Sequence, residues 1–418
     1  MQFKRVVVTG IGTINPLGNN IQEYFDNLDE GKSGASLITR FDTAPFKTKF
    51  ACEIKDYDPA KYGIDRKEAR KLDLYSQYAL IAAEEAVKDS GLDLEKVDQD
   101  RVGVILGSGI GGIDTLFQEV LGYCDGDRTP RFSPFLIPKM IPDMAPGLIS
   151  MKYGFRGPNF ATVSACASST HAMCDALNYI RMGKADIIVS GGSEAGITIP
   201  SIGGFNSAQA MSTNNDEYLT ASRPFDKTRD GFVMGEGSGI LIFEEYEHAI
   251  ARGAKIYAEV AGSAMTADAY HITAPHPEGI GARNVMNLAL KDSNLSPEDV
   301  DYINVHGTAT PLGDIAELKA VQTLFGEHAY KLNISATKSM TGHLLGAAGS
   351  VEALACVHAI VSGTIPPTIN FQNEDPEIDY KLNLTLNKAQ KRDVNVAMNN
   401  TFGFGGHNSC IIFKKVKS

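Results

Sequence analysis

Short apolar runs rich in β-branched residues recur along this chain, and longer amphipathic or alanine-rich stretches separate them. Examples are "RVVVTGIG", "RVGVILGSGIGG", "NFATVSA", "ADIIVSGGSEAG", "GILIFEEYEHA", "YINVHGTAT" and "NVAMNNTFGFGG". Such runs are typical of buried strands, and the stretches between them are long enough for crossover helices. The alternation predicts an α/β fold. Several runs end in Gly, Ser, Thr, Cys or His, and ligands gather at the carboxyl ends of strands in such sheets.

The length of the chain predicts two halves rather than one core. It has 418 residues, more than a single hydrophobic core usually serves. A charged helix-like stretch, "EEYEHAIARGAK", lies near residue 250, and new strand-like segments begin at "IYAEVAGSA". We therefore predict an N-terminal half, 1–250, and a C-terminal half, 251–418. No repeat between them is visible in the sequence.

Composition excludes several classes of protein. The formal net charge of −11 disfavours nucleic acid as a partner, because binding phosphates needs a basic face. We expect no membrane helix, since no apolar run approaches the roughly 18 residues required. The first residues show no signal-peptide pattern, so we expect a cytoplasmic protein. The six cysteines lack the spacing of a zinc site or a disulfide framework and should be reduced thiols.

One cysteine stands at a corner. In "ATVSACASSTHAM", Cys166 lies where a strand-like run becomes a helix-like run that ends near Gly183. The N–H groups and the positive dipole end at a helix start favour an anion, so we expect a lowered thiol pKa and a reactive thiolate. A buried structural cysteine is the alternative. The other cysteines are expected to pack in the core: Cys52, Cys124, Cys174, Cys356 and Cys410.

Two histidines and a lysine lie in comparable settings. His306 ends a strand in "NVHGTATPLGD", and His343 precedes an alanine-rich stretch in "TKSMTGHLLGAAG". Both are candidate partners of a nucleophilic thiol. Lys338 has small or uncharged neighbours, so we expect it to be partly buried and to need a carboxylate. Glu352 is a candidate for that carboxylate or for a structural cation ligand. No catalytic metal is predicted, because Cys166 and the histidines lack ligand spacing.

A glycine-rich string, "NNTFGFGGHNS", lies near the C-terminus. Its three glycines within residues 403–406 would let the backbone approach a ligand closely and aim N–H groups at it. A simple hairpin turn is the alternative. The earlier string "GIGTINPLG" lacks the G-x-G-x-x-G spacing, so we do not predict a nucleotide site there.

Several long strings resemble those of the β-ketoacyl-acyl carrier protein synthases, the elongating condensing enzymes of fatty-acid synthesis. They are "VVVTGIGTINPLG", "SACASS", "ASRPFDKTRDGFVMGEGSG", "AYHITAP", "HGTATPLGD", "TKSMTGHLLGAAGSVEA" and "FGFGGHN". The resemblance covers essentially the whole chain, and the chain looks similar to the type II enzyme. It implies a thiolase-like fold, in which two similar α/β halves form five layers (αβαβα), and a homodimer.

The resemblance also implies catalytic roles. Cys166 would accept an acyl group from the phosphopantetheine thioester of an acyl carrier protein. The N–H groups of Cys166 and Phe404 would hold the oxyanion, and Phe404 would be a gate that moves on acylation. His306 and His343 would hold the charge that forms when malonyl-carrier protein loses carbon dioxide, before the carbanion attacks the acyl group. Lys338 would tune the site electrostatically.

Further residues match positions that contact substrate in the family. Thr308 and Thr310 match positions that hydrogen-bond the pantetheine arm, and Ile110 matches the far end of the acyl pocket. Phe402 is assigned to the same substrate-binding set. His407 replaces the threonine that is common in the family's glycine-rich string, so the hydrogen bonding behind the gate is expected to differ.

Carrier proteins are acidic, so we expect a basic docking face despite the negative net charge. The stretch "IDRKEARKLD" supplies Arg66, Lys67, Arg70 and Lys71, with the members of each fourfold-spaced pair on one helical side. Arg131 would extend this patch. We expect no required cofactor, apart from a structural monovalent cation that Glu352 could ligate.

Three other functions stay open at this point. A type I or polyketide ketosynthase would use the same chemistry on other acyl chains. A non-catalytic chain-length partner subunit would typically lack the cysteine, so Cys166 with both histidines argues against it. A nicotinamide oxidoreductase is disfavoured because no proper glycine fingerprint is present.

Overall fold

The computed structural model describes residues 3–416, and its main feature is a ten-stranded mixed sheet with the order β10-β9-β13-β14-β8-β1-β7-β6-β4-β5. The first half contributes β1 (Val6–Ile14), β4 (Val102–Gly107), β5 (Asn159–Thr162), β6 (Ile187–Glu194) and β7 (Gly237–Glu245). The second half contributes β8 (Ala258–Ala267), β9 (Tyr302–Asn304), β10 (Asn333–Ser335), β13 (Val396–Gly403) and β14 (His407–Lys414).

The two halves of the sheet repeat one topology. In the first, β1 is antiparallel to β7 and β7 to β6, after which β6, β4 and β5 run parallel. In the second, β8, β14, β13, β9 and β10 repeat these relations in the same order. The halves meet where Val7 pairs with Glu259 and Val8 with Ala258. The repeat is structural, although the sequence shows no sign of it.

Helices fill and cover the sheet. The inner helices are α7 (Ser168–Arg181) and α13 (Ala348–Ser362), and the outer ones include α3 (Leu74–Asp89), α6 (Met144–Tyr153), α10 (Ile280–Asp292) and α11 (Pro311–Phe325). The inner pair contacts strands of both halves, whereas α3 packs on β1 and β7, and α10 on β8 and β14. This arrangement is the five-layered thiolase-like fold, so the predicted fold class is confirmed.

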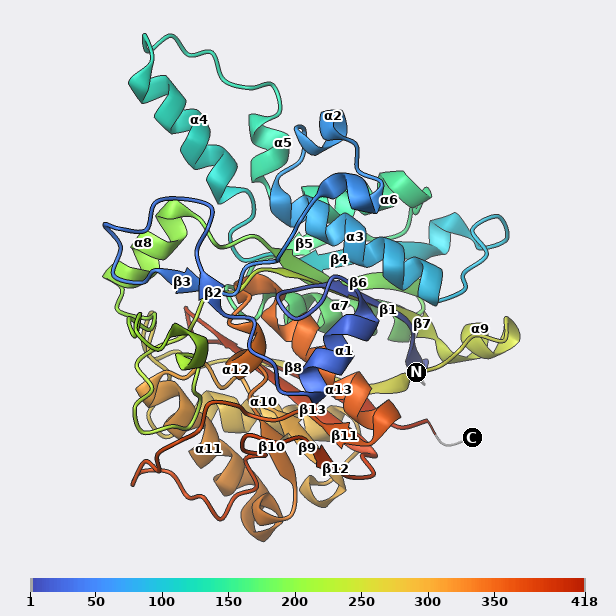
Figure 1. Ribbon diagram of the computed structural model, residues 1–418. Coiled ribbons are helices and arrows are strands. Elements are labelled where there is room, and N and C mark those ends of the chain that lie inside the picture. The colour runs from blue at the N-terminus through green and yellow to red at the C-terminus, as the bar shows by residue number, and fades with distance from the viewer. Residues whose placement is uncertain (1–2, 417–418) are drawn as a thin grey trace.

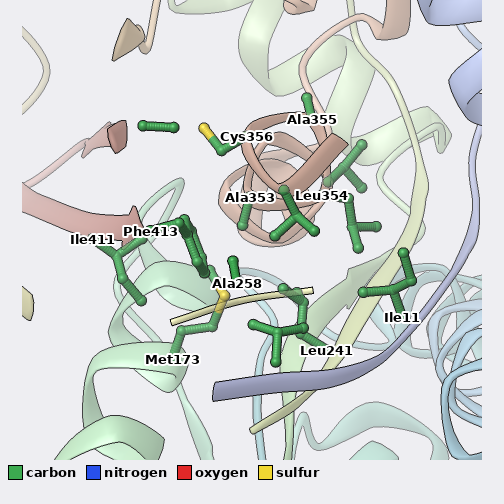
Figure 2. Packing of buried hydrophobic residues seen from close by; sticks show 14 of the residues in the cluster. Ile11, Met173, Leu241, Ala258, Ala353, Leu354, Ala355, Cys356, Ile411 and Phe413 are labelled. Carbon is green, nitrogen blue, oxygen red and sulfur yellow. The ribbon is translucent and has the colours of Figure 1, made fainter. Parts of the chain in front are cut away.

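The centre of the core lies around the inner helices. Figure 2 shows Met173 of α7 and Leu354 of α13 among side chains from several strands, including Leu241 of β7 and Ile411 of β14. Small side chains such as Ala353 let the inner helix approach the sheets closely.

The inner helix α13 corrects one expectation. The segment Leu345–Ser362 has a mean hydropathy of 1.5 over 18 residues, which is long and apolar enough to cross a membrane. Our expectation that no such run exists was therefore wrong. Because 89% of this segment is buried inside the fold, its composition is that of a central core helix, which is apolar on all sides.

Shorter elements complete the chain. They are α1 (Ile21–Asp29), α2 (Arg66–Ala69), α4 (Ile113–Asp125), α5 (Leu136–Met140), α8 (Ile199–Ser207), α9 (Tyr246–Ala251), α12 (Lys338–Thr341) and the two-stranded pairs β2 (Ser36–Leu37) with β3 (Phe50–Ala51) and β11 (Thr364–Ile365) with β12 (Gln390–Lys391). Helices α4 and α5 project from one end of the body (Figure 1). The boundary placed at residue 250 falls in α9 and stays a prediction.

Candidate active site

Cys166 lies in a tight turn between β5 and α7. The preceding residue, Ala165, has a φ of 51°, in the left-handed region that a residue with a Cβ rarely adopts. Two hydrogen bonds fix the turn: the N–H of Ser164 donates to Oγ of Ser168 at 2.9 Å, and the N–H of Ala167 donates to the carbonyl of Ser164 at 3.1 Å. Cys166 as a whole residue is half-buried, and it lines a cavity.

The expected lowering of the Cys166 pKa was wrong. Burial raises the pKa of this thiol to about 12, although the charge of Lys338 and the backbone N–H groups of Phe404 and Cys166 act in the opposite direction. The helix also begins only at Ser168, so the sulfur precedes the first turn, in which a helix dipole acts most strongly. The resting nucleophile is therefore a neutral thiol.

His343 contacts the nucleophile directly. Its Nε2 atom lies 3.1 Å from Sγ of Cys166, and the backbone N–H of His343 donates to the carbonyl of Val233 at 2.7 Å. The His306 ring lies at right angles to that of His343, with 5.4 Å between centroids. Burial and the charge of Lys338 lower the pKa of both rings well below 6.5. Both imidazoles are therefore neutral near pH 7.

A buried carboxylate holds the backbone at His306. Oε1 of Glu317, on α11, accepts the N–H of His306, and Oε2 accepts the N–H of Gly307, both at 2.9 Å. Burial raises the pKa of Glu317 to about 7. Our sequence reasoning missed this residue. A usable signal was present, because Asp314 and Glu317 are acidic residues one turn apart on the face of α11 that also carries buried Val321.

Lys338 and Glu352 form a buried ion pair between α12 and α13, and each side chain is 2% exposed. Glu352 is thus the carboxylate partner that the sequence suggested for the lysine. Burial raises the pKa of Glu352 to about 7, against the effect of the Lys338 charge. Within residues 3–416, no group of three or more His, Cys, Asp or Glu side chains is placed to hold a metal ion. The monovalent cation stays a prediction.

The glycine-rich string is both a hairpin turn and a wall of the site. It joins β13 to β14, and Gly405 has a φ of 87°. A Cβ on Gly403 would lie 2.9 Å from the carbonyl of Ser164 and 3.1 Å from the nitrogen of Cys166. Only glycine therefore lets β13 approach the nucleophile's turn this closely, which places the N–H of Phe404 beside the sulfur.

These residues surround one cavity of about 390 Å³. Its walls include Cys166, His306, Thr308, Thr310, His343, Phe402 and Phe404. The hydroxyl oxygens of Thr308 and Thr310 lie 3.0 Å apart. The structure thus brings together the residues that the sequence assigned to nucleophile, imidazole pair, oxyanion donor and pantetheine contact.

Ile110 lies beside this cavity rather than on its described wall. It packs in an apolar cluster with Phe205, Phe232 and Leu345, and these three residues do line the cavity. Behind the glycine-rich turn, the His407 ring lies edge-on to His171, with centroids 6.2 Å apart.

The basic residues proposed for docking lie on the surface. Lys67, Arg70, Lys71 and Arg131 are all exposed. Helix α2 spans only Arg66–Ala69, so our expectation of a helical face through the fourfold-spaced residues was wrong. The N-cap Asp65 starts this turn by accepting the N–H groups of Lys67 and Glu68, but the turn is not continued. Lys67 and Lys71 line a separate surface groove of about 550 Å³.

The other cysteines divide into two groups. Cys52, Cys174, Cys356 and Cys410 are buried, as expected for core residues. Cys124, near the end of α4, is exposed, so its expected burial was wrong.

A cysteine from one half of a duplicated five-layered fold, facing two imidazoles from the other half, defines a condensing enzyme of the thiolase-like class. The model of the "Beta-ketoacyl synthase, N-terminal domain" matches residues 3–249, and that of the "Beta-ketoacyl synthase, C-terminal domain" matches residues 257–372. The chain belongs to the β-ketoacyl synthase family.

Curated relatives match along the full length. A "3-oxoacyl-[acyl-carrier-protein] synthase 2" from Synechocystis sp. is 50% identical over 415 residues, which cover 99% of each chain. A protein of the same name from Staphylococcus aureus strain COL is 48% identical over 418 residues, which cover 100% of each chain.

Solved structures match the fold equally well. A β-ketoacyl synthase from Burkholderia phymatum has a TM-score of 0.91 and 34% identity, with 99% of this chain and 100% of that chain covered. A chain from a type II polyketide synthase acyl-carrier protein in complex with its ketosynthase, bound to the hexaketide, has a TM-score of 0.91 and 35% identity, with both chains fully covered.

Proposed function

We propose that this protein is an elongating β-ketoacyl-acyl carrier protein synthase of type II fatty-acid biosynthesis. The observation that carries the proposal is the contact between Sγ of Cys166 and Nε2 of His343, in a cavity that His306 and Phe404 also line. The name shared by the Synechocystis and Staphylococcus relatives supports the type II assignment.

The first half-reaction transfers an acyl group to Cys166. The neutral thiol gives its proton to the neutral imidazole of His343 as the sulfur attacks the thioester carbonyl of acyl-carrier protein. The N–H groups of Cys166 and Phe404 stabilise the oxyanion. The bond between the acyl carbon and the pantetheine sulfur then breaks, and the leaving thiolate takes the proton from His343. Acyl-Cys166 and free carrier thiol are the products.

The second half-reaction makes the carbon–carbon bond. Malonyl-carrier protein binds with its pantetheine arm beside Thr308 and Thr310, and loss of carbon dioxide leaves an enolate. His306 and His343 donate N–H groups to the enolate oxygen, which is where the negative charge develops. His343 does so in the tautomer that carries its proton on Nε2, the nitrogen that faces Cys166, so that proton moves from Nδ1 to Nε2 between the two half-reactions. The enolate carbon attacks acyl-Cys166, the carbon–sulfur bond breaks, and the released thiolate takes a proton from solvent water, which restores the resting thiol. β-Ketoacyl-carrier protein leaves.

The partner is an acidic acyl carrier protein that carries acyl and malonyl groups on phosphopantetheine. Two facts support this: the exposed basic residues around α2 and, for another family member, the solved complex of a ketosynthase with its carrier protein. The chemistry above needs no cofactor. We expect the reaction to occur in the cytoplasm, where type II carriers would be free to exchange.

We propose a homodimer as the working form. The α4–α5 region projects from the body (Figure 1). It exposes large apolar side chains that a monomer would leave in water: Leu116, Val120, Leu121, Phe132, Phe135 and Ile137. Strand β5 ends the sheet, so its outer edge has no strand partner in the described sheet. A second copy would cover both features.

The test is direct. Purified protein is supplied with malonyl-carrier protein and a series of acyl-carrier proteins, and the products are identified by mass spectrometry. We expect β-ketoacyl products in which the acyl chain is longer by one malonyl-derived two-carbon unit, and a Cys166→Ser variant should form none at a comparable rate. Absence of elongation by the unaltered protein would overturn the proposal.

A further inference from the structure

A fully buried carboxylate outside the catalytic set joins two turns of the chain. Glu194 is the last residue of β6 and is 0% exposed. Its Oε2 atom accepts the N–H of Gly109 at 2.6 Å and that of Gly346 at 2.9 Å. Its Oε1 atom accepts hydrogen bonds from the hydroxyl of Ser108 at 3.0 Å and from the N–H of Ile110 at 3.3 Å. These hydrogen-bond partners are all uncharged, so only oriented dipoles hold this group.

The two turns carry apolar residues of one cluster beside the cavity. The first turn follows β4 and ends at Ile110, while the second is the short helical turn Leu345–Ala347 just beyond His343. The side chains of Ile110 and Leu345 belong to one cluster with Phe232. Leu345 and Phe232 also line the cavity that contains the nucleophile.

The backbones of the Ile110 turn and the Leu345 turn approach the Glu194 carboxylate closely, so their spacing depends on it. A Cβ on Gly109 would lie 2.9 Å from Oε2 of Glu194 and 3.3 Å from the carbonyl of Ala165, next to the nucleophile. A Cβ on Gly346 would lie 2.6 Å from the same Oε2 atom. Both turns are therefore packed against Glu194, and its oxygens set how far apart their backbones stand. Burial raises the pKa of Glu194 to about 7, as expected where uncharged donors replace water.

We propose that Glu194 is a positioning residue for acyl-chain selection, because it holds the Ile110 turn against the Leu345 turn and so limits the apolar space open to the bound chain. The inference rests on the proposed function. An acyl chain on Cys166 has to extend into apolar surroundings, and this cluster supplies them next to the nucleophile. If the Ile110 turn were released, the cluster could open further and longer chains would gain room.

The Glu194→Gln variant tests this selectively. The amide oxygen can still accept the N–H groups of Gly109 and Gly346, and the amide NH₂ can donate to Oγ of Ser108. The NH₂ group, however, faces the N–H of Ile110, where two donors cannot bond. We expect the ratio of kcat/KM for long over short acyl-carrier proteins to rise roughly tenfold, which is the size of a change by about one methylene in an apolar pocket. Decarboxylation of malonyl-carrier protein without acyl primer should stay unchanged.

Glu85→Gln is the matched control. Glu85 is a partly buried carboxylate on the outer helix α3, and it accepts the N–H groups of Thr13 at 2.9 Å and Ile21 at 2.8 Å. Its substitution should change thermal stability but not the chain-length ratio. A ratio that moves equally in both variants would assign the effect to general loosening and overturn the inference.

A second variant covers the case in which Glu194→Gln does not fold. Ser108→Ala removes one donor from the same carboxylate and should raise the ratio in the same direction, by a smaller factor. If the unaltered protein elongates acyl chains normally but the folded variants keep its ratio of kcat/KM for long over short chains, the inference about Glu194 is wrong and the proposed function still holds. An unaltered protein that elongates no acyl-carrier protein contradicts the proposed function instead.

Discussion

The Nε2 atom of His343 lies 3.1 Å from the Sγ atom of Cys166, although 177 positions separate the two residues in the sequence. His306, the other imidazole of the cavity, packs edge-on against the His343 ring instead, with centroids 5.4 Å apart. The two imidazoles therefore stand in different relations to the nucleophile, and their removal should have different effects.

Substitution of His343 by alanine should slow both half-reactions, whereas His306→Ala should slow mainly the second. Only His343 is placed to take the thiol proton, but both rings can donate to the enolate oxygen. Each variant should lose about 10²–10³-fold in malonyl decarboxylation, the usual cost of one such donor. Acyl-enzyme formation, followed by mass spectrometry, and carbon dioxide release measure the two steps separately. Equal slowing of acyl transfer by both variants would contradict this division.

The Cys166 thiol should stay protonated in the mildly alkaline range. Its pKa is raised to about 12, and below that value the thiolate fraction falls tenfold for each pH unit. Ultraviolet absorbance of thiolate, taken as the difference between the protein and its Cys166→Ala variant, should therefore be negligible up to about pH 9. A rise in this absorbance difference near neutral pH would contradict the raised pKa. It would show that the helix start lowers the pKa of the thiol more than burial raises it.

Alanine at position 403 should disable the nucleophile's turn. The added Cβ would meet the carbonyl of Ser164 at 2.9 Å and the nitrogen of Cys166 at 3.1 Å, so the turn or the hairpin has to shift. We expect acyl transfer to fall roughly 10²-fold, as is usual when reacting groups are displaced by about 1 Å.

The control for that experiment is Gly147→Ala in α6, where a Cβ would meet nothing within 4 Å. It should leave acyl transfer unchanged and stabilise the helix by about 0.5–1 kcal/mol. Similar acyl-transfer rates in the two variants would mean that the close approach of Gly403 is unimportant.

Glu317 should make stability depend on pH. Burial raises its pKa from 4.5 to about 7, so the folded chain holds this proton more tightly than the unfolded chain does. The resulting stabilisation is fully present below about pH 4.5 and is lost as the pH rises through about 7. Relative to Glu317→Gln, the unaltered protein should lose roughly 3 kcal/mol of unfolding free energy between about pH 4.5 and 8.

Urea unfolding at fixed protein concentration and several pH values measures this difference. Other titrating groups are common to both proteins and cancel in the comparison. The glutamine side chain also loses one of the hydrogen bonds that Glu317 accepts. This loss displaces the variant's plot of unfolding free energy against pH from that of the unaltered protein by an amount that does not depend on pH. Curves that stay parallel across this pH range would therefore contradict the raised pKa.

Charge reversal of Lys67 and Arg70 to glutamate should weaken the use of carrier-bound substrates. Both residues are exposed, so the effect should act through attraction to an acidic carrier protein. The KM for acyl-carrier protein should rise roughly tenfold at low salt and less at high salt. Reaction of Cys166 with a small alkylating agent should not change. Lys291→Glu, an exposed charge reversal on α10, is the control, and an equal rise in KM there would contradict the docking assignment.

Several strands of the large sheet could be predicted from sequence because they contain local apolar runs rich in β-branched residues, such as β1 and β7. The ends of these runs also placed Cys166, His306 and the glycine-rich turn at corners, where the structure has them. Their pairing could not be predicted in this way. That Val7 of β1 lies beside Glu259 of β8 depends on contacts between distant segments, and no local pattern records them.

At the site, the roles of the carboxylates and the pKa of the Cys166 thiol also depend on contacts between distant segments, so they could not be predicted from sequence. Glu194 and Glu317 accept hydrogen bonds from backbone N–H groups of other segments. Every residue except proline has such a group, so the sequence does not indicate which ones a carboxylate will bind. The pKa of Cys166 depends on how the surrounding chain encloses it, whereas the sequence showed only the helix start. The apolar run that includes α13 was overlooked, and its composition alone would not have separated a central helix from a membrane helix, since both are apolar on every side.

The duplicated sheet has a consequence for biosynthesis of the chain. Its first half supplies the sulfur, its second half both imidazoles, and its last hairpin the amide of Phe404. That hairpin follows Cys166, His306 and His343 in the chain, so a product terminated before the second half would contain the thiol without its partner groups. Such a fragment would lack the groups that accept the thiol proton and hold the oxyanion, so it would catalyse neither acyl transfer nor condensation.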